Sequence, residues 1–179
     1  ATEWVRIGIA VLLGALATAV IEETLFRGGL QSTLSKGGHV WLAAMIGSAV
    51  FAAAHFLDAE AYAGPIEWWS GLDVLWRSLQ GFRDAPWHDS FIALLLAGLL
   101  LCFLRLRSGD IAAAIGVHMG WVVVIRLCKS LTELDRASPW VVWVGAYDGV
   151  VGYAGALLFL SLLAIGWVVY KPSPQLSGS

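Results

Sequence analysis

The chain carries near its start an apolar stretch that decides the fold class, residues 4–26, WVRIGIAVLLGALATAVIEETLF. A transmembrane helix needs about 20 predominantly apolar residues, and this stretch has that length. It lacks a strongly basic leading segment, and it runs into glutamates and an arginine where a signal peptide has small residues for cleavage. We therefore predict a membrane-spanning helix here in preference to a signal peptide.

Four more apolar stretches follow, at residues 39–57, 90–104, 111–128 and 149–170. The composition agrees with them, because 59% of the residues are hydrophobic and only 13% are charged, against about 25% charged in soluble domains. This composition excludes a soluble enzyme and a disordered chain, two cysteines cannot make a disulfide scaffold, and a net charge of −2 offers no basic surface to nucleic acid. We predict an all-α, polytopic membrane helix bundle of about five transmembrane helices. It forms one domain, residues 1–171, with a flexible tail at 172–179.

The loop between the second and third stretches, about residues 58–89, is far longer than ordinary loops. Its apolar residues recur at spacings of three and four, which predicts a helix with one apolar stripe, formed by Trp68, Trp69, Leu72, Leu75, Trp76, Leu79 and Phe82. A helix of this kind lies in the headgroup layer of a lipid bilayer. A helix that covers the mouth of the bundle is at least as good an interpretation as a lid that gates substrate.

Five ionisable residues within or next to the predicted spans stand out: Glu22, Glu23, Arg27, His55 and His118. Each costs about 2.5 to 3.5 kcal/mol on insertion scales, so each is a candidate for a functional site. Glu23 and Arg27 are four residues apart and share one face of a helix, which predicts a neutralised ion pair. Glu22 is turned away from Arg27 and is the free carboxylate, the kind of group that can act as a general base.

The two histidines lie among small residues, which let neighbouring helices pack closely. We therefore expect Glu22, His55 and His118, from three separate spans, to converge at one depth in the membrane. One glutamate and two histidines can activate water and stabilise an oxyanion. Three other interpretations stay open: a buried ion pair with a structural role only, histidines that are hydrogen-bonded in the packed interior, and a zinc site, although no His-Glu-x-x-His helix is present.

Three segments resemble the motifs of one known family. In chain order they are Glu22-Glu23-Thr24-Leu25-Phe26-Arg27, Phe51-Ala52-Ala53-Ala54-His55 and His118-Met119-Gly120-Trp121-Val122. They are similar to the three motifs of the CPBP family, the CAAX proteases and bacteriocin-processing enzymes of membranes, and the resemblance covers about residues 15–125.

The resemblance implies an intramembrane glutamic endopeptidase that needs no metal cofactor. In such an enzyme Glu22 would be the base that polarises water together with His55, and His118 would stabilise the oxyanion. Glu23 and Arg27 would hold the helix and tune Glu22. The substrate would be a membrane-associated peptide or protein. The segments that flank the motifs, residues 25–31 and 104–109, are similar to bacterial members, which implies the plasma membrane of a bacterium.

Two features differ from the family pattern. The family has Asn or Asp where this chain has Val122, and valine has no hydrogen-bond donor, so Trp121 or a backbone amide would have to replace it. Family members also carry further helices before the Glu-Glu helix, so we expect either a compact variant or part of a longer chain or larger assembly. The alternative function is a non-catalytic membrane protein, an immunity protein, chaperone or assembly factor, that keeps the polar cluster as a structural network. A proton-coupled carrier would need a polar path across the membrane, whereas the sequence places a cluster near one depth.

Overall fold

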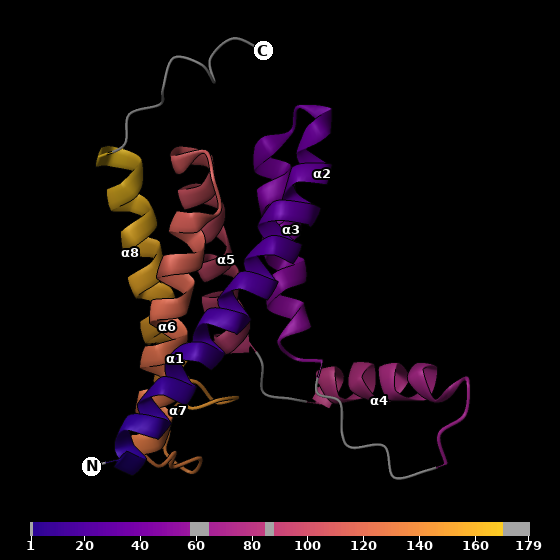
Figure 1. The fold of residues 1–179 in the computed structure, drawn as a ribbon, viewed down its shortest axis with the longest axis vertical. Helices are drawn as coiled ribbons and strands as arrows, with labels where there is room; N and C mark the ends of the chain where they lie inside the picture. The colour runs from indigo at the N-terminus through magenta and orange to yellow at the C-terminus, as the bar shows by residue number, and fades with distance from the viewer. Residues whose placement is uncertain (1, 58–64, 85–87, 170–179) are drawn as a thin grey trace.

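The computed structural model describes residues 2–57, 65–84 and 88–169. Over these ranges it is helical and contains no strand (Figure 1). The elements in chain order are α1 (Thr2–Glu23), the π-helix η1 (Thr24–Gln31), α2 (Ser32–Leu34), the 3-10 helix η2 (Ser35–Gly37), α3 (Val40–Ala54), α4 (Ser70–Asp84), α5 (His88–Ser108), α6 (Ala112–Leu131), α7 (Val141–Val144) and α8 (Tyr153–Val169). The predicted all-α fold class is confirmed.

The five predicted apolar stretches all form helices, which fall into a longer and a shorter group. Among the described residues, three helical segments are long and apolar enough to cross a membrane: Glu3–Gly37, His88–Ser108 and Ala112–Leu131. The other two, α3 and α8, are apolar but shorter. The architecture is that of a helical membrane bundle.

The predicted end of the first span was wrong. We placed it at Phe26, but the helical segment continues to Gly37 through η1, α2 and η2. Arg27 and Gln31, two polar residues beyond the predicted end, are 1% and 0% exposed. Arg27 donates hydrogen bonds inside the protein, to Glu23 and to the main-chain oxygen of Gly98. Because its charge is satisfied there, the helix does not have to end where the charge appears.

The predicted start of the last span was also wrong. We began it at residue 149, but α8 begins at Tyr153. The carboxylate of Asp148 accepts hydrogen bonds from the main-chain N–H groups of Val150 and Val151 at 2.9 and 2.8 Å. These bonds hold the chain in a turn after Asp148, which delays the start of the helix.

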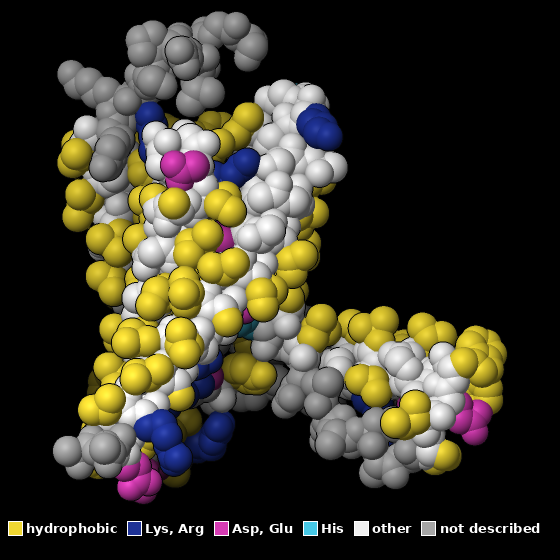
Figure 2. All heavy atoms as spheres, in the orientation of Figure 1, with side chains coloured by type: hydrophobic (Ala, Val, Ile, Leu, Met, Phe, Trp, Pro, Cys, Tyr) yellow, Lys and Arg dark blue, Asp and Glu magenta, His cyan; other side chains and the backbone are white. Residues whose placement is uncertain are grey.

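α5 lies between the other long helices. It packs against α3, α6 and α8, while α1 packs against α6 (Figure 1). Small residues occur at these contacts: Gly98 of α5 faces Ser48 of α3, and Ala15, Ala19 and Ala114 are fully buried. Large apolar side chains cover the outer faces instead (Figure 2). This arrangement suits a lipid solvent, where close backbone approach drives helix association.

α4 confirms that the long loop contains a helix. It lies across the direction of the other helices and stands apart from the bundle (Figure 1). The stripe residues Leu72, Leu75, Trp76 and Leu79 are exposed, whereas Trp68 and Trp69 precede the helix. Its position in the headgroup layer stays a prediction. The rest of the predicted loop at 58–64 and 85–87, and the tail at 172–179, fall outside the described residues.

Candidate active site

The two neighbouring glutamates at the end of α1 face different surroundings. Glu23 is fully buried, whereas the side chain of Glu22 is 26% exposed and lines a cavity. The difference agrees with the prediction from helix geometry that only Glu23 shares a face with Arg27. Directly after Glu23 the helix widens into the π-helix η1, a local form that is frequent at functional sites.

Glu23 is the centre of a closed polar network. Its Oε1 atom accepts a hydrogen bond from Arg27 at 3.1 Å and lies 2.8 Å from Nδ1 of His118. Arg27 also donates to the main-chain oxygen of Gly98 at 3.1 Å. The predicted Glu23–Arg27 pair is confirmed, but the contact with His118 was not predicted. No pattern in the sequence could have indicated it, because the two residues lie on α1 and α6.

His55 lies at the end of α3, and its ring is held by the main chain. Nδ1 is 2.9 Å from the carbonyl oxygen of Phe51. A carbonyl can only accept, so Nδ1 carries the hydrogen and, in the neutral ring, Nε2 is left as an acceptor. That Nε2 atom faces Glu22.

Glu22, His55 and His118 come together from α1, α3 and α6. Oε2 of Glu22 lies 3.9 Å from Nε2 of His55 and 3.7 Å from Nε2 of His118. Both separations are longer than a direct hydrogen bond and suit a shared water molecule. Oε2 is buried and makes no hydrogen bond to the described part of the chain. The expected convergence of the three side chains is therefore present in the structure.

A cavity of ≈ 290 Å³, here called the Glu22 cavity, contains these three groups. Its other lining residues are mainly apolar or aromatic: Thr18, Phe51, Ser90, Leu94, Ala97, Trp121, Val122, Ile125, Lys129, Tyr147, Asp148, Val151 and Phe159. Phe51 makes edge contacts with the rings of His55 and His118, at centroid distances of 4.6 and 6.0 Å. The guanidinium of Arg27 lies 4.5 Å from the same ring. Phe51 thus joins the Glu22 cavity to the closed network.

Two further residues from the third motif line the Glu22 cavity. Val122 follows His118 by one turn of α6 and shares its face. Trp121 packs on Phe159 of α8, with ring centroids 4.6 Å apart. Ser90 and Lys129 also line the cavity and were not predicted from the sequence. Both lie near predicted span ends, where polar residues are common and carry no signal.

The donors needed for a metal site are not grouped in the described ranges. No set of three or more His, Cys, Asp or Glu side chains within them is arranged to hold a metal ion. Nδ1 of His118 and Oε1 of Glu23 already bond to each other. The arrangement suits activation of water by a carboxylate and imidazoles.

Comparison with protein families gives one match, described as type II CAAX prenyl endopeptidase Rce1-like, over residues 4–124. The comparisons with curated proteins and with solved structures gave no match. The matched segment begins in α1 and ends in α6, so it includes all three helices that supply Glu22, His55 and His118. With its membrane-spanning helices and this match over most of its length, the chain is an integral membrane protein that belongs to the Rce1-like family of type II CAAX prenyl endopeptidases.

Proposed function

We propose that this protein is an intramembrane endopeptidase that hydrolyses a peptide bond of a membrane-associated peptide or protein. The observation that carries the proposal is the meeting of Glu22 Oε2 with the Nε2 atoms of His55 and His118, at 3.9 and 3.7 Å, inside a mainly apolar cavity. The family match supports it at the level of the protease class. The similarity of the flanking segments to bacterial members supports a place in a bacterial plasma membrane.

In this proposal Glu22 is the general base and His55 its partner. A water molecule beside Oε2 of Glu22 can also reach the acceptor Nε2 of His55. Glu22 takes one proton from the water while the water oxygen bonds to the carbonyl carbon of the peptide. When the tetrahedral intermediate collapses, the C–N bond breaks and the same proton passes to the leaving amine. The products are a carboxylic acid and an amine, and no co-reactant other than water is consumed.

His118 stabilises the oxyanion of the intermediate. The Glu23 carboxylate accepts the hydrogen of Nδ1, which fixes the ring with Nε2 toward the Glu22 cavity. In this role His118 is the imidazolium, with its second N–H directed at the oxyanion. Arg27 and Glu23 are positioning residues that act through His118. This assignment differs from the sequence-based expectation that they tune Glu22.

Val122 makes the enzyme slower than a member with a donor at that position. Removing one oxyanion donor costs on the order of 10² to 10³ in rate. Val122 also favours the alternative function, a non-catalytic membrane protein, more than any other residue of the site. The two functions differ in one measurement, the dependence of peptide cleavage on Glu22.

The test is a Glu22→Gln substitution in the full chain reconstituted in lipid vesicles. The probe is a set of acylated, internally quenched apolar peptides, and the readout is the rate of cleavage. We expect a loss of about 10² to 10⁴-fold, the range for a general base. Glu3→Gln, at the exposed end of α1, is the matched control and keeps full activity. Equal cleavage by Glu22→Gln and the unmodified chain would overturn the proposal, and so would an absence of Glu22-dependent cleavage of any peptide.

A further inference from the structure

The Glu22 cavity continues along one face of α6 as a groove. His118, Val122, Ile125 and Lys129 all line it, and their spacing of four, three and four residues places them in one stripe. His118 and Lys129 are about three helical turns apart, or about 16 Å along the axis. The groove therefore has the proposed reaction centre at one end and a lysine at the other.

Two polar groups distinguish this groove from ordinary lipid-facing surface. Of the described lining residues, Lys129 is the only lysine or arginine. Ser90 is 1% exposed, and its hydroxyl makes no hydrogen bond to the described residues. A buried donor of this kind calls for a ligand or a water molecule. A peptide main chain in the groove would supply the acceptor that Ser90 lacks.

Lys129 is held loosely, whereas its partner Asp148 is held firmly. Nζ of Lys129 lies 3.4 Å from Oδ2 of Asp148, and the lysine side chain is 48% exposed. Oδ1 of Asp148 accepts hydrogen bonds from the main-chain N–H groups of Val150 and Val151. An ammonium group has three donors, so Lys129 can bind a second carboxylate without leaving Asp148.

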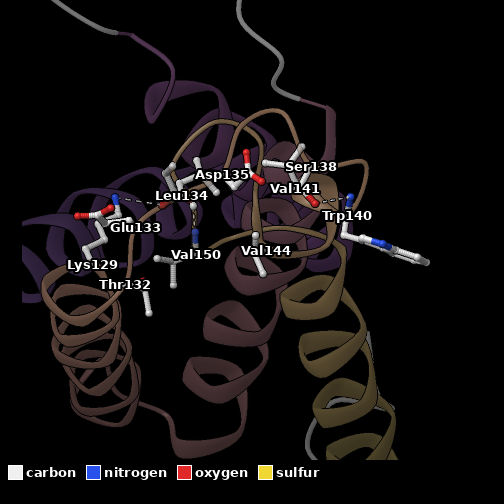
Figure 3. A pocket seen from close by; sticks show the side chains of 12 residues that line it. Lys129, Thr132, Glu133, Leu134, Asp135, Ser138, Trp140, Val141, Val144 and Val150 are labelled. Carbon is white, nitrogen blue, oxygen red and sulfur yellow. Dashed lines mark hydrogen bonds and ion pairs between the residues drawn. The ribbon is translucent and has the colours of Figure 1, made fainter.

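The ion pair also borders a second hollow, of ≈ 480 Å³, here called the outer pocket. Figure 3 shows Lys129 at the end of α6, beside the loop that carries Leu134 and Asp135. Glu133 and Asp135 line the outer pocket as well, and their charges oppose a carboxylate there. Asp148 lines both hollows, whereas Glu133 and Asp135 line only the outer pocket, so fewer carboxylates compete for Lys129 on the groove side.

We propose that Lys129 is a specificity-determining residue that binds a carboxylate of the substrate, three or four residues from the scissile bond. The inference rests on the proposed endopeptidase function. An extended chain covers about 3.3 to 3.6 Å per residue, so about 16 Å corresponds to fewer than five residues, and the stem of Lys129 shortens the gap further. The carboxylate is either the C-terminus of the substrate or an Asp or Glu side chain.

The test measures binding separately from cleavage. It uses the full chain with Glu22→Gln in nanodiscs and three fluorescent peptides with one apolar sequence. One peptide ends in a free carboxylate, one in an amide, and one in an amide with Asp as its last residue. We expect the first or third peptide, or both, to bind at least about tenfold more tightly than the second. Preference for the first alone identifies the C-terminus as the source, and equal preference for the first and third means that either carboxylate serves.

Two substitutions then move this preference in opposite directions. Lys129→Met keeps the apolar stem and abolishes the preference. Asp148→Asn keeps the oxygen that accepts from Val150 and Val151 but removes the competing charge, so it strengthens the preference. Lys36→Met, an exposed lysine in η2, is the matched control and leaves it unchanged.

Three results would overturn the proposal. The first is equal binding of all three peptides, and the second is a carboxylate preference that survives Lys129→Met. The third is a change of the preference in the same direction in Lys129→Met and Asp148→Asn, which would mean that the ion pair has only a structural role. Cleavage of the amide peptide by the unmodified chain, lost in Glu22→Gln, tests the proposed function independently. A missing carboxylate preference with intact cleavage is thereby distinguished from a protein that does not cleave peptides.

Discussion

Glu22 and Glu23 are adjacent in sequence, yet one belongs to an open site and the other to a closed one. Around Glu23 the contacts are direct, at 2.8 and 3.1 Å, and the side chains of Glu23 and Arg27 are at most 1% exposed. Around Glu22 no direct hydrogen bond forms at Oε2, the imidazoles stand at 3.7 and 3.9 Å, and about a quarter of the side chain is exposed. Direct contacts between buried charges hold the Glu23 network in place, whereas the Glu22 carboxylate faces a cavity and is available for chemistry.

The largest effect on stability is expected from removing the charge of Glu23 in the closed site. Glu23→Gln leaves the guanidinium of Arg27 buried without its counter-charge, which costs about 3 to 5 kcal/mol in the free energy of unfolding. The matched control is Asp73→Asn on α4, whose pair with Arg77 has the same spacing and a 3.0 Å contact but is exposed. It should cost at most about 1 kcal/mol. Unfolding of both variants in mixed micelles measures the difference, and equal costs would contradict the contrast between the two sites.

The next effect concerns the open site. Val122→Asn places a hydrogen-bond donor on the cavity face of α6 one turn from His118, so we expect cleavage to accelerate about tenfold to a hundredfold. Val123→Asn has the same chemistry but lies off the cavity lining, and it should give no acceleration. Peptide cleavage rates in lipid vesicles provide the measurement. An unchanged rate for Val122→Asn would show that the oxyanion lies elsewhere.

A smaller effect is expected where the closed site meets the helix contacts. A methyl group at Gly98 would lie 2.9 Å from Cβ and 3.2 Å from Cα of Ser48, so Gly98→Ala forces α3 and α5 apart. Overpacking of this kind costs about 1 to 3 kcal/mol. Gly116→Ala, on α6 with open space around it, is the control and should be neutral or slightly stabilising. The free energies of unfolding of the two variants provide the measurement. Equal values would show that close packing at Gly98, whose main-chain oxygen accepts from Arg27, does not contribute to stability.

The smallest effect is expected from metal removal. In the proposed mechanism His118 bonds to Glu23 and water is activated by Glu22, so no step uses a metal ion. Cleavage measured before and after dialysis against a strong chelator should be the same within error. Loss of activity that zinc restores would instead favour the zinc interpretation of the sequence.

Local periodicity predicted most of what is local. The opposite directions of Glu22 and Glu23, the ion pair to Arg27 and the helix around Trp76 follow from residue spacing on one element. The five apolar helices follow from the length and composition of the apolar stretches. The end of the first helix was not predictable in this way, because Arg27 reads as a boundary until Gly98 on another helix is known to accept its hydrogen bond.

Contacts between distant elements had to come from the structure. The bond from His118 to Glu23 depends on how α6 packs against α1, and single-sequence patterns contain no such information. Lys129 and Asp148 are ordinary polar residues at span ends when they are read in order along the chain. Only the course of the cavity along α6 shows that Lys129 shares a groove with His118.

The short helix α3 has a consequence for the lipid around it. α3 has 15 residues, which at 1.5 Å per residue gives about 22 Å. The hydrocarbon core of a typical bilayer is about 30 Å thick. Lipid next to helices that are too short thins to match them, so the bilayer should be dented beside α3, the helix that carries His55. A thinner bilayer shortens the path by which water reaches Glu22.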